Sequence, residues 1–295
     1  MKLLKLLLAL CLALLASASP LTPGDPEWIT PPMEAEPGRR RGIPYNNPDF
    51  IPYFYQDNAQ VGWIYNWYST THDTRSAYWE YVPMLWGIRD DMTANWLDGA
   101  RKAANEQYDN PTHLLSFNEP DNCEHGAGGS CISPSAAAIA WNQFMQPCKL
   151  MKPKMYLGSP AVTNSGSSTM GLSWLRSFLA ACHDCTIDFI CVHWYDSATN
   201  VAYFKSYLND VRKVANGRPI WITEFKPSGT DGEIRRFLDE VIPWLDASKD
   251  IHRYAYFMAR EGLLVNDEGT GMNDLGKHYV YWRLDGKGGF TTDPA

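Results

Sequence analysis

Two glutamates of this sequence, Glu119 and Glu224, each end a short apolar run that is typical of a buried strand. The first lies in Leu114–Asp121 and the second in Pro219–Phe225. Strand alternation predicts that each glutamate shares a face with the apolar residues before it. Glycoside hydrolysis needs two convergent carboxyl groups, because one protonates the leaving oxygen while the other meets positive charge at the anomeric carbon. The pattern therefore favours a sugar-cleaving site if the two strand ends meet.

Other roles for these glutamates stay open on the sequence alone. Either one could form a structural ion pair, with Arg253 or Arg260 as its partner. A non-catalytic protein could use both carboxylates as acceptors for sugar hydroxyls. A metal-dependent barrel hydrolase would need a His-x-His strand or clustered carboxylates, and the sequence has neither. We therefore expect no metal and no organic cofactor.

Aromatic and polar residues lie at or near the other predicted strand ends. A sugar ring presents apolar C–H faces, so tryptophan and tyrosine planes can serve as platforms while asparagine and histidine bind hydroxyls. Core packing is the alternative for each aromatic residue, and His193 could be a core histidine. Tyr195 shares a strand face with His193 and could hydrogen-bond a carboxylate. The predicted substrate-binding residues are Asn66, Trp67, Trp86, His193, Trp194, Tyr195 and Tyr256.

The elements that must position these residues alternate between short apolar runs and segments of helical period. Several runs are apolar on both faces, as expected of parallel strands inside a barrel covered by helices. Eight strands in one chain of this length predict an α/β fold, a single (β/α)₈ TIM barrel, whose strands all open at one face. An open doubly wound sheet is the alternative, but no Gly-rich phosphate-binding turn follows any strand. The predicted strands are Arg41–Tyr45, Val61–Trp67, Tyr81–Gly87, Leu114–Asn118, Met155–Pro160, Phe189–Tyr195, Pro219–Phe225 and Tyr254–Met258.

The amino end has the pattern of a secretory signal peptide at residues 1–18, with Lys2 and Lys5 before an apolar run and Ala16-Ser17-Ala18 after it. The run is shorter than the roughly 20 residues that span a bilayer, which disfavours a membrane anchor. We expect a secreted protein, extracellular or in a cell wall. Residues 19–41 predict a Pro-rich extended segment, and its basic end, Arg39 to Arg41, is either a protease cut site or a solvated cluster. The catalytic barrel is expected at 42–295.

Composition and charge narrow the function further. The 295 residues are 45% hydrophobic and 20% charged, which indicates a globular rather than a disordered chain. Lysine and arginine number 26 against 33 acidic residues, a net charge of −7, so nothing indicates nucleic-acid binding. We expect a monomer with no membrane span.

Cysteine usage fits an oxidising compartment. Of seven cysteines, one lies in the signal peptide, which leaves six. Cys123 and Cys131 flank a Gly-rich loop and are the favoured disulfide pair. The segment Cys182–Cys185 invites a zinc or redox interpretation, but a second Cys-x-x-Cys is absent. Cys191 lies within an apolar run and is expected to be a buried thiol.

Seven motifs, taken together and in order, resemble glycoside hydrolase family 128. The resemblance covers nearly all of Gly42 to Trp282, which makes it specific, whereas a single Asn-Glu-Pro would be weak. The motifs are Gly42–Asn47, Trp63–Trp67, Val82–Gly87, Phe117–Asp121, Val192–Tyr195, Trp221–Phe225 and Arg253–Phe257.

The resemblance implies a (β/α)₈ barrel of a large retaining clan that cleaves β-1,3-glucan. It implies that Glu119, in Asn-Glu-Pro, is the acid/base, that Glu224 is the nucleophile, and that Asn118 holds the sugar 2-hydroxyl. Retention needs carboxyl groups about 5 to 5.5 Å apart, against about 6.5 to 9.5 Å for inversion. The Cys123–Cys131 loop departs from the family pattern and could change which subsites are open. We expect endo action; a non-catalytic or weakly active β-glucan-binding cell-wall protein is the alternative.

Overall fold

The structure of the chain is a computed structural model that describes residues 40–55, 59–71, 79–106, 112–152, 154–284 and 290–291. These residues belong to one compact unit. The predicted signal peptide at 1–18 lies outside the described residues, as does the predicted extended segment apart from Arg40 and Arg41, so both stay predictions.

The two described arginines of the basic run do not form a solvated cluster. Arg41 is 3% exposed and lies in the first strand, where its guanidinium pairs with Asp246 at 3.1 Å and donates to the Tyr279 carbonyl at 2.9 Å. Arg40 donates to the Ser248 carbonyl at 2.7 Å. The solvated-cluster alternative is therefore wrong for these two residues, because Asp246 and main-chain carbonyls of the barrel accept their hydrogen bonds.

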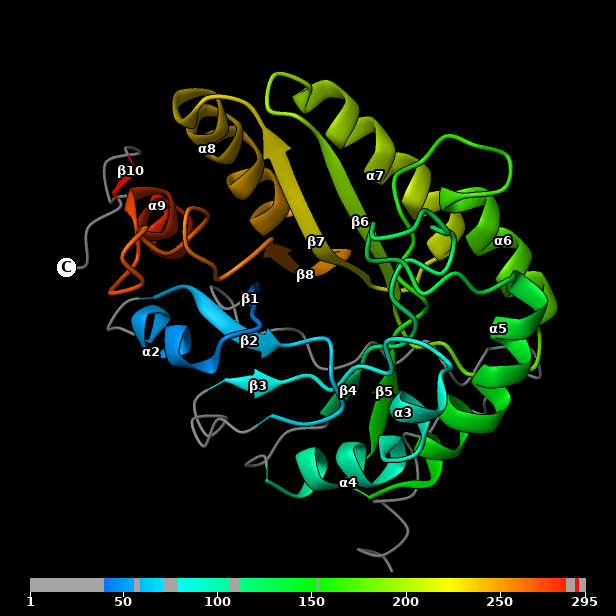
Figure 1. The fold of residues 1–295 in the computed structure, drawn as a ribbon. Coiled ribbons are helices and arrows are strands. Elements are labelled where there is room, and N and C mark those ends of the chain that lie inside the picture. The colour runs from blue at the N-terminus through cyan, green and yellow to red at the C-terminus, as the bar shows by residue number, and fades with distance from the viewer. Residues whose placement is uncertain are drawn as a thin grey trace, which may run out of the picture. The chain divides into compact units, whose positions relative to one another are not determined.

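Among the described residues, eight parallel strands make up the centre of the fold, one in each region that the sequence predicts (Figure 1). The third, fourth and fifth strands are shorter than predicted, and Pro83, which lacks an N–H, lies two residues after the end of the third. The strands are β1 (Arg41–Pro44), β2 (Val61–Tyr65), β3 (Glu80–Tyr81), β4 (Thr112–Leu114), β5 (Met155–Leu157), β6 (Ile190–Ser197), β7 (Ile220–Ser228) and β8 (Ile251–Tyr256).

Strand pairing runs round the whole set. Six strands pair in the order β3-β2-β1-β8-β7-β6, and β4 pairs with β5. Isolated parallel bridges link the two sheets, Met84 with Leu115 beside β3 and β4, and Gly158 with Phe189 beside β5 and β6. This is the strand order of the predicted (β/α)₈ barrel, with single bridges instead of ladders at two places.

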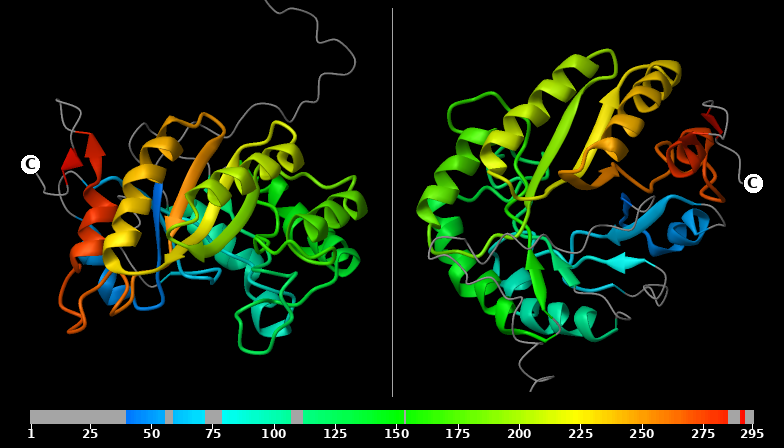
Figure 2. Two further views of the ribbon diagram at one scale, coloured as in Figure 1. Left: turned by 90° about the horizontal axis from the view of Figure 1, so that it is seen from above. Right: turned by 180° about the vertical axis from the view of Figure 1, so that it is seen from behind.

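Helices lie outside the strands, as Figures 1 and 2 show. The long helices after β6 and β7 present an apolar stripe to the sheet; Phe204, Leu208 and Val211 of the helix after β6 are fully buried. Ser133 accepts a hydrogen bond from the Ala136 amide and caps the helix that begins at Pro134. The helices are α2 (Ile51–Phe54), α3 (Asp90–Thr93), α4 (Trp96–Glu106), α5 (Pro134–Ala140), α6 (Gly171–Ala181), α7 (Val201–Ala215), α8 (Asp231–Ala247) and α9 (Asp274–Tyr281).

Shorter elements complete the description. Two 3₁₀ turns lie at Pro48–Phe50 and Gln146–Leu150, and a π turn at Trp141–Met145 continues α5. The short strands β9 (Arg283–Leu284) and β10 (Phe290–Thr291) pair antiparallel. Within the described residues, no helix combines the length and apolarity that crossing a bilayer requires.

The described cysteines form two disulfides. Cys123 is bonded to Cys131, which confirms the predicted pair. Cys182 is bonded to Cys185, so these sulfurs are joined to each other and do not offer the free thiolates that a zinc site needs. Cys191 is a buried free thiol, as predicted.

Candidate active site

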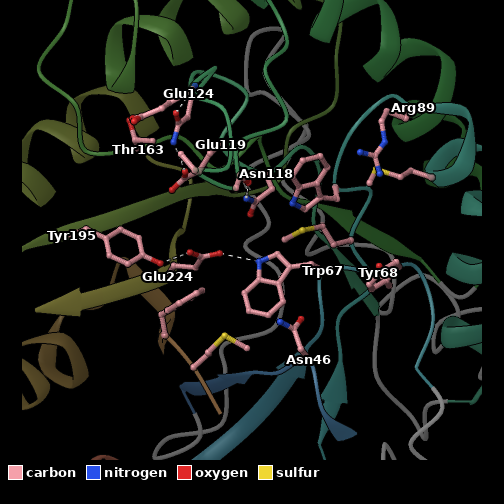
Figure 3. A pocket seen from close by; sticks show the side chains of 18 of the residues that line it. Asn46, Trp67, Tyr68, Arg89, Asn118, Glu119, Glu124, Thr163, Tyr195 and Glu224 are labelled. Carbon is pink, nitrogen blue, oxygen red and sulfur yellow. Dashed lines mark hydrogen bonds between the residues drawn. The ribbon is translucent and has the colours of Figure 1, made fainter. Parts of the chain in front are cut away.

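Glu119 and Glu224 meet at the carboxyl end of the barrel (Figure 3). One carboxylate oxygen of each, with one ring nitrogen of His193, all lie within 4.8 Å of one another. Glu119 is 8% exposed and Glu224 is 4% exposed. The two carboxylates are therefore close enough to act on the same bond of a sugar substrate.

The local geometry that aims Glu224 differs from the predicted alternation. Trp221 packs in the cluster inside the barrel, while Ile220 and Ile222 pack toward the helices. The pairing of β6 with β7 then shifts by one residue, since Val192 pairs with Ile222 and His193 with Glu224. Such a bulge re-aims the following side chain, and here it brings Glu224 to the interior. The predicted face shared with the isoleucines is therefore wrong.

Glu119 reaches the site by another local device. Leu115 packs inside the barrel but Phe117 packs toward the helices, so the predicted alternation fails here too. The backbone at Glu119 has φ = 38°, a left-handed conformation that is uncommon for a residue with a side chain. Its amide donates to the Ala161 carbonyl at 2.8 Å, which fixes the turn. Uncommon backbone conformations of this kind cluster at functional sites.

Two donors hold the Glu224 carboxylate, and a further hydroxyl lies close to it. The indole N–H of Trp67 donates to Oε1 at 2.9 Å, and the Tyr195 hydroxyl donates to Oε2, which is the carboxylate contact its strand face predicts. The Tyr65 hydroxyl donates to the Thr223 carbonyl at 2.9 Å and lies 3.4 Å from Oε1. Burial and the charge of Glu224 raise the pKa of both tyrosines, so both stay protonated donors. The carboxylate is thereby fixed in one orientation.

His193 bridges the two glutamates. It is fully buried, and its Nδ1 lies 2.9 Å from Glu119 Oε1 and 3.5 Å from Glu224 Oε2. Burial alone would lower the pKa of His193, but the charges of Glu224 and Glu119 outweigh it, so the pKa is raised. Burial would raise the pKa of Glu119, but the hydrogen bond from His193 outweighs it, so this pKa is lowered. The proton between them therefore rests on the imidazole in the free protein.

We expect ¹⁵N NMR of the imidazole to show that His193 titrates above 6.5, its ordinary value. Replacing Glu224 by Gln should move that pKa down, because it removes the charge that raises it most. A His193 pKa at or below 6.5 in the unmodified protein would contradict the shared-proton arrangement.

The same three residues also present the donor set of a metal site. Glu119, His193 and Glu224 offer one nitrogen and two oxygens, and all three are buried. However, His193 Nδ1 already faces Glu119 Oε1 at hydrogen-bond distance, and its raised pKa means that the ring binds a proton more tightly than an ordinary histidine. A metal ion binds only the neutral imidazole, so the proton competes with it.

A cleft of about 1140 Å³ contains the carboxylates. Every one of the eight strands, or the segment directly after it, contributes to the lining, from Asn46 after β1 to Met258 after β8. The predicted residues Trp67, Trp86, Asn118 and Tyr195 all line it, as do the two glutamates. This volume exceeds the usual upper range of small-molecule sites, about 1,000 Å³, and suits a ligand of several sugar units.

Two of these lining residues have a second contact. Asn118 donates to the Gly128 carbonyl at 3.0 Å, while its Oδ1 is buried and has no partner among the described residues. The guanidinium of Arg89 lies 5.8 Å from the centre of a Trp86 ring, so part of that aromatic face is already covered.

Four predicted substrate-binding residues do not line the cleft. His193 lies beneath it between the carboxylates. Trp194 is fully buried and stacks on Phe237, because alternation turns it toward the helices when His193 faces the interior. Tyr256 is 1% exposed in the core. Asn66 accepts from the Tyr81 hydroxyl at 2.7 Å and holds its own loop.

The structural ion pairs considered for the glutamates do not form with Arg253. Its guanidinium contacts Glu80 on β3 instead. Two further residues, Tyr65 and Asn122, contact the carboxylates and are not among the predicted site residues. Tyr65 has the strand parity of Trp67, which is a usable signal, whereas Asn122 donates to Glu119 Oε2 at 3.1 Å from a loop whose path no periodicity predicts.

Comparisons with known proteins agree with this site. The family described as the glycosyl hydrolase catalytic core matches residues 42–279. A curdlan-specific exo-β-1,3-glucanase from Blastomyces gilchristii, of glycoside hydrolase family 128 subgroup III, was crystallised with glucose; it is 35% identical, with a TM-score of 0.73 over 83% of this chain and 98% of that one. A subgroup I endo-β-1,3-glucanase from Amycolatopsis mediterranei, crystallised with laminaritriose, is 30% identical, with a TM-score of 0.65 over 81% and 98%.

A further relative is longer than this chain. Alkali-sensitive linkage protein 1 of Schizosaccharomyces pombe is 30% identical over 239 residues, which cover 76% of this chain and 41% of that protein. The catalytic-core match and the two solved enzymes, each covered almost completely, show that this chain belongs to glycoside hydrolase family 128.

Proposed function

We propose that the protein is a secreted, retaining endo-β-1,3-glucanase in which Glu224 is the nucleophile and Glu119 the acid/base. The observation that carries the proposal is the pair of carboxylates, with oxygens within 4.8 Å, each held by its own set of donors. The relatives named above supply the linkage, since both solved enzymes are β-1,3-glucanases. Two disulfides support an oxidising compartment.

The reaction proceeds by two displacements. Glu224 attacks the anomeric carbon, the bond to the leaving oxygen breaks, and that oxygen takes a proton from Glu119. Water then attacks the glycosyl ester and gives its proton to Glu119, which restores Glu224 as a carboxylate. Two inversions at one carbon give net retention.

Glu119 needs a proton for the first step, and His193 holds it. The Nδ1 to Oε1 distance of 2.9 Å lets the proton move along an existing hydrogen bond without rearrangement. Esterification of Glu224 removes the charge that most raises the pKa of His193. The pKa of His193 is then lower, so the imidazole more easily stays neutral while Glu119 acts as base.

The endo mode is supported by the extent of the cleft. Its lining continues past the carboxylates toward Thr163 on one side and toward Tyr68 and Arg89 on the other (Figure 3). A chain can therefore occupy sites on both sides of the bond that breaks.

A substrate panel tests the proposal. We expect the purified protein to cleave β-1,3-glucan, and not β-1,4- or β-1,6-glucan, with a rapid fall in mean chain length. Proton NMR should show the β-anomer as the first product, before mutarotation, and a chelator should not reduce the rate. The α-anomer first would refute retention, steady release of one small sugar would refute endo action, and binding without new reducing ends would indicate a non-catalytic glucan-binding protein.

A further inference from the structure

The loop that the family pattern did not explain lies directly beside the acid/base. We call Cys123–Cys131 the disulfide loop; the bond between its two cysteines closes it, and it leads into α5. The mechanism above uses none of its residues. Three residues of the disulfide loop nevertheless line the cleft, namely Glu124, Ala127 and Gly128. Asn122, immediately before the loop, lines it too.

Hydrogen bonds tie both ends of the disulfide loop to the catalytic segment. Before the loop, Asn122 donates its side-chain amide to Glu119 Oε2 at 3.1 Å, and its backbone amide to the Glu119 carbonyl at 3.0 Å. Within the loop, the Gly128 carbonyl accepts from the Asn118 side chain at 3.0 Å. The Ser130 amide donates to the Asn118 carbonyl at 2.9 Å. The disulfide loop therefore packs against Glu119, the proposed acid/base, and against Asn118 before it.

Backbone packing makes this contact close. A Cβ added at Gly129 would lie 2.1 Å from the Asn122 carbonyl oxygen and 2.8 Å from that of Glu119. Only glycine can stand there without moving the backbone at Glu119. Gly128 adopts φ = 84°, a left-handed conformation that turns the chain back toward Cys131. The backbone of the disulfide loop therefore fits closely against the turn at Glu119.

The two carboxylates have different surroundings, and this gives the cleft a direction. Trp67 and Tyr195 contact Glu224, whereas Glu124 and Thr163 lie on the side of Glu119 (Figure 3). Asn122 contacts Glu119 directly. The acid/base protonates the oxygen that departs, so the departing sugar must lie on the Glu119 side. The loop presents a carboxylate and backbone polar groups there, and these suit sugar hydroxyls better than an apolar leaving group.

We propose that the disulfide loop forms the wall that binds the departing part of the glucan chain, and that its disulfide holds Asn122 against Glu119 as a positioning residue. The inference rests on the proposed function, since it assumes that Glu119 meets the leaving oxygen. An acceptor sugar that attacks the glycosyl ester would occupy the same wall, so the loop would also govern transfer to sugars.

Two substrates distinguish the contribution of the disulfide loop from that of the two carboxylates. Laminari-oligosaccharides have a sugar leaving group that needs both a proton and the wall. A dinitrophenyl β-glycoside of laminaribiose has a leaving group that departs unprotonated and offers no sugar to the loop. The test variant is Cys123→Ser/Cys131→Ser, and the matched control is Cys182→Ser/Cys185→Ser, which opens the other disulfide, outside the cleft lining.

Opening the disulfide loop should lower kcat/KM for the oligosaccharides by about tenfold or more beyond any loss with the aryl substrate, because a hydrogen bond to a charged group is lost. The control should lower both equally or neither. Asn122→Ala should move the basic limb of the pH profile upward, since loss of its hydrogen bond lets Glu119 and His193 hold their shared proton more tightly. Glu124→Ala, which leaves the disulfide intact, should raise KM for oligosaccharides alone.

The outcomes are distinguishable. Equal losses on both substrates in the loop variant, with an unmoved pH profile in Asn122→Ala, would overturn the inference and leave the proposed function standing. A wild-type protein that hydrolyses neither substrate would overturn the proposed function itself. If Cys123→Ser/Cys131→Ser fails to fold by circular dichroism, Asn122→Ala and Glu124→Ala decide the question.

Discussion

Replacing Glu224 by Gln is expected to lower kcat for β-1,3-glucan by about four orders of magnitude or more, since no anion then remains to attack the anomeric carbon. The fold should persist, because the amide oxygen can still accept from Trp67 or Tyr195 and the volume is unchanged. The measurement is the rate of reducing-end release, with the affinity for laminari-oligosaccharides followed by calorimetry. Affinity should stay within a few-fold of wild type.

Glu119→Ala supplies the matched comparison and assigns the second role. It should lose glucan hydrolysis but keep the first displacement on a dinitrophenyl β-glycoside, because that leaving group needs no proton. Added azide should then react with the accumulated glycosyl ester at Glu224 and give a β-glycosyl azide. Wild-type-like glucan hydrolysis by Glu224→Gln, or an α-azide from Glu119→Ala, would contradict the two assignments.

The two glutamates proposed to be catalytic could be predicted because short apolar runs mark parallel strands, and a polar residue at the end of such a run must lie at one face of the barrel. Glu119 and Glu224 follow from this reasoning, and so does the Tyr195 contact. The reason given for their orientation does not hold. A bulge in β7 and a left-handed φ at Glu119 aim the side chains, and neither leaves a periodic signal.

Composition does not show which aromatic residues line the cleft, because a tryptophan at a strand end can face either the barrel interior or the helices. Trp67 lines the cleft, yet its indole N–H holds Glu224, so its structural role is to orient the carboxylate. Trp194 follows His193 directly, so strand alternation turns Trp194 away from the interior that His193 faces. This signal is present in the sequence. Asn122 depends on a loop closed by a disulfide, whose path follows from tertiary contacts alone.

The largest expected effect on stability lies in the barrel interior, away from the carboxylate pair. Glu80 on β3 contacts Arg253 on β8 and lies 2.7 Å from His113 Nδ1 on β4, and the Arg253 guanidinium lies 4.3 Å from a Trp221 ring centre. Three strands are thus joined by one buried charge cluster. Glu80→Gln should lower the free energy of unfolding by about 3 to 5 kcal/mol, because Arg253 is left buried without its counter-charge.

Urea unfolding measures this loss, and Glu80→Gln/Arg253→Met is the control. Removing both charges should restore much of the stability, since apolar replacement of a buried pair is often neutral. A double variant no more stable than Glu80→Gln would mean that the loss comes from packing and not from an unpaired charge.

Acid should weaken the same cluster in two stages. Burial lowers the pKa of His113, so the unfolded chain takes up a proton first and stability falls as the pH drops below 6.5. Burial would raise the pKa of Glu80, but Arg253 and His113 outweigh it and lower the pKa from 4.5 to about 2. The Glu80 contribution, about 3 kcal/mol by linkage, is complete above pH 4.5 and is lost as the pH falls toward 2. The unfolding free energy of Glu80→Gln should therefore fall less steeply over that interval than that of wild type, and parallel curves would show that Glu80 is not the titrating group.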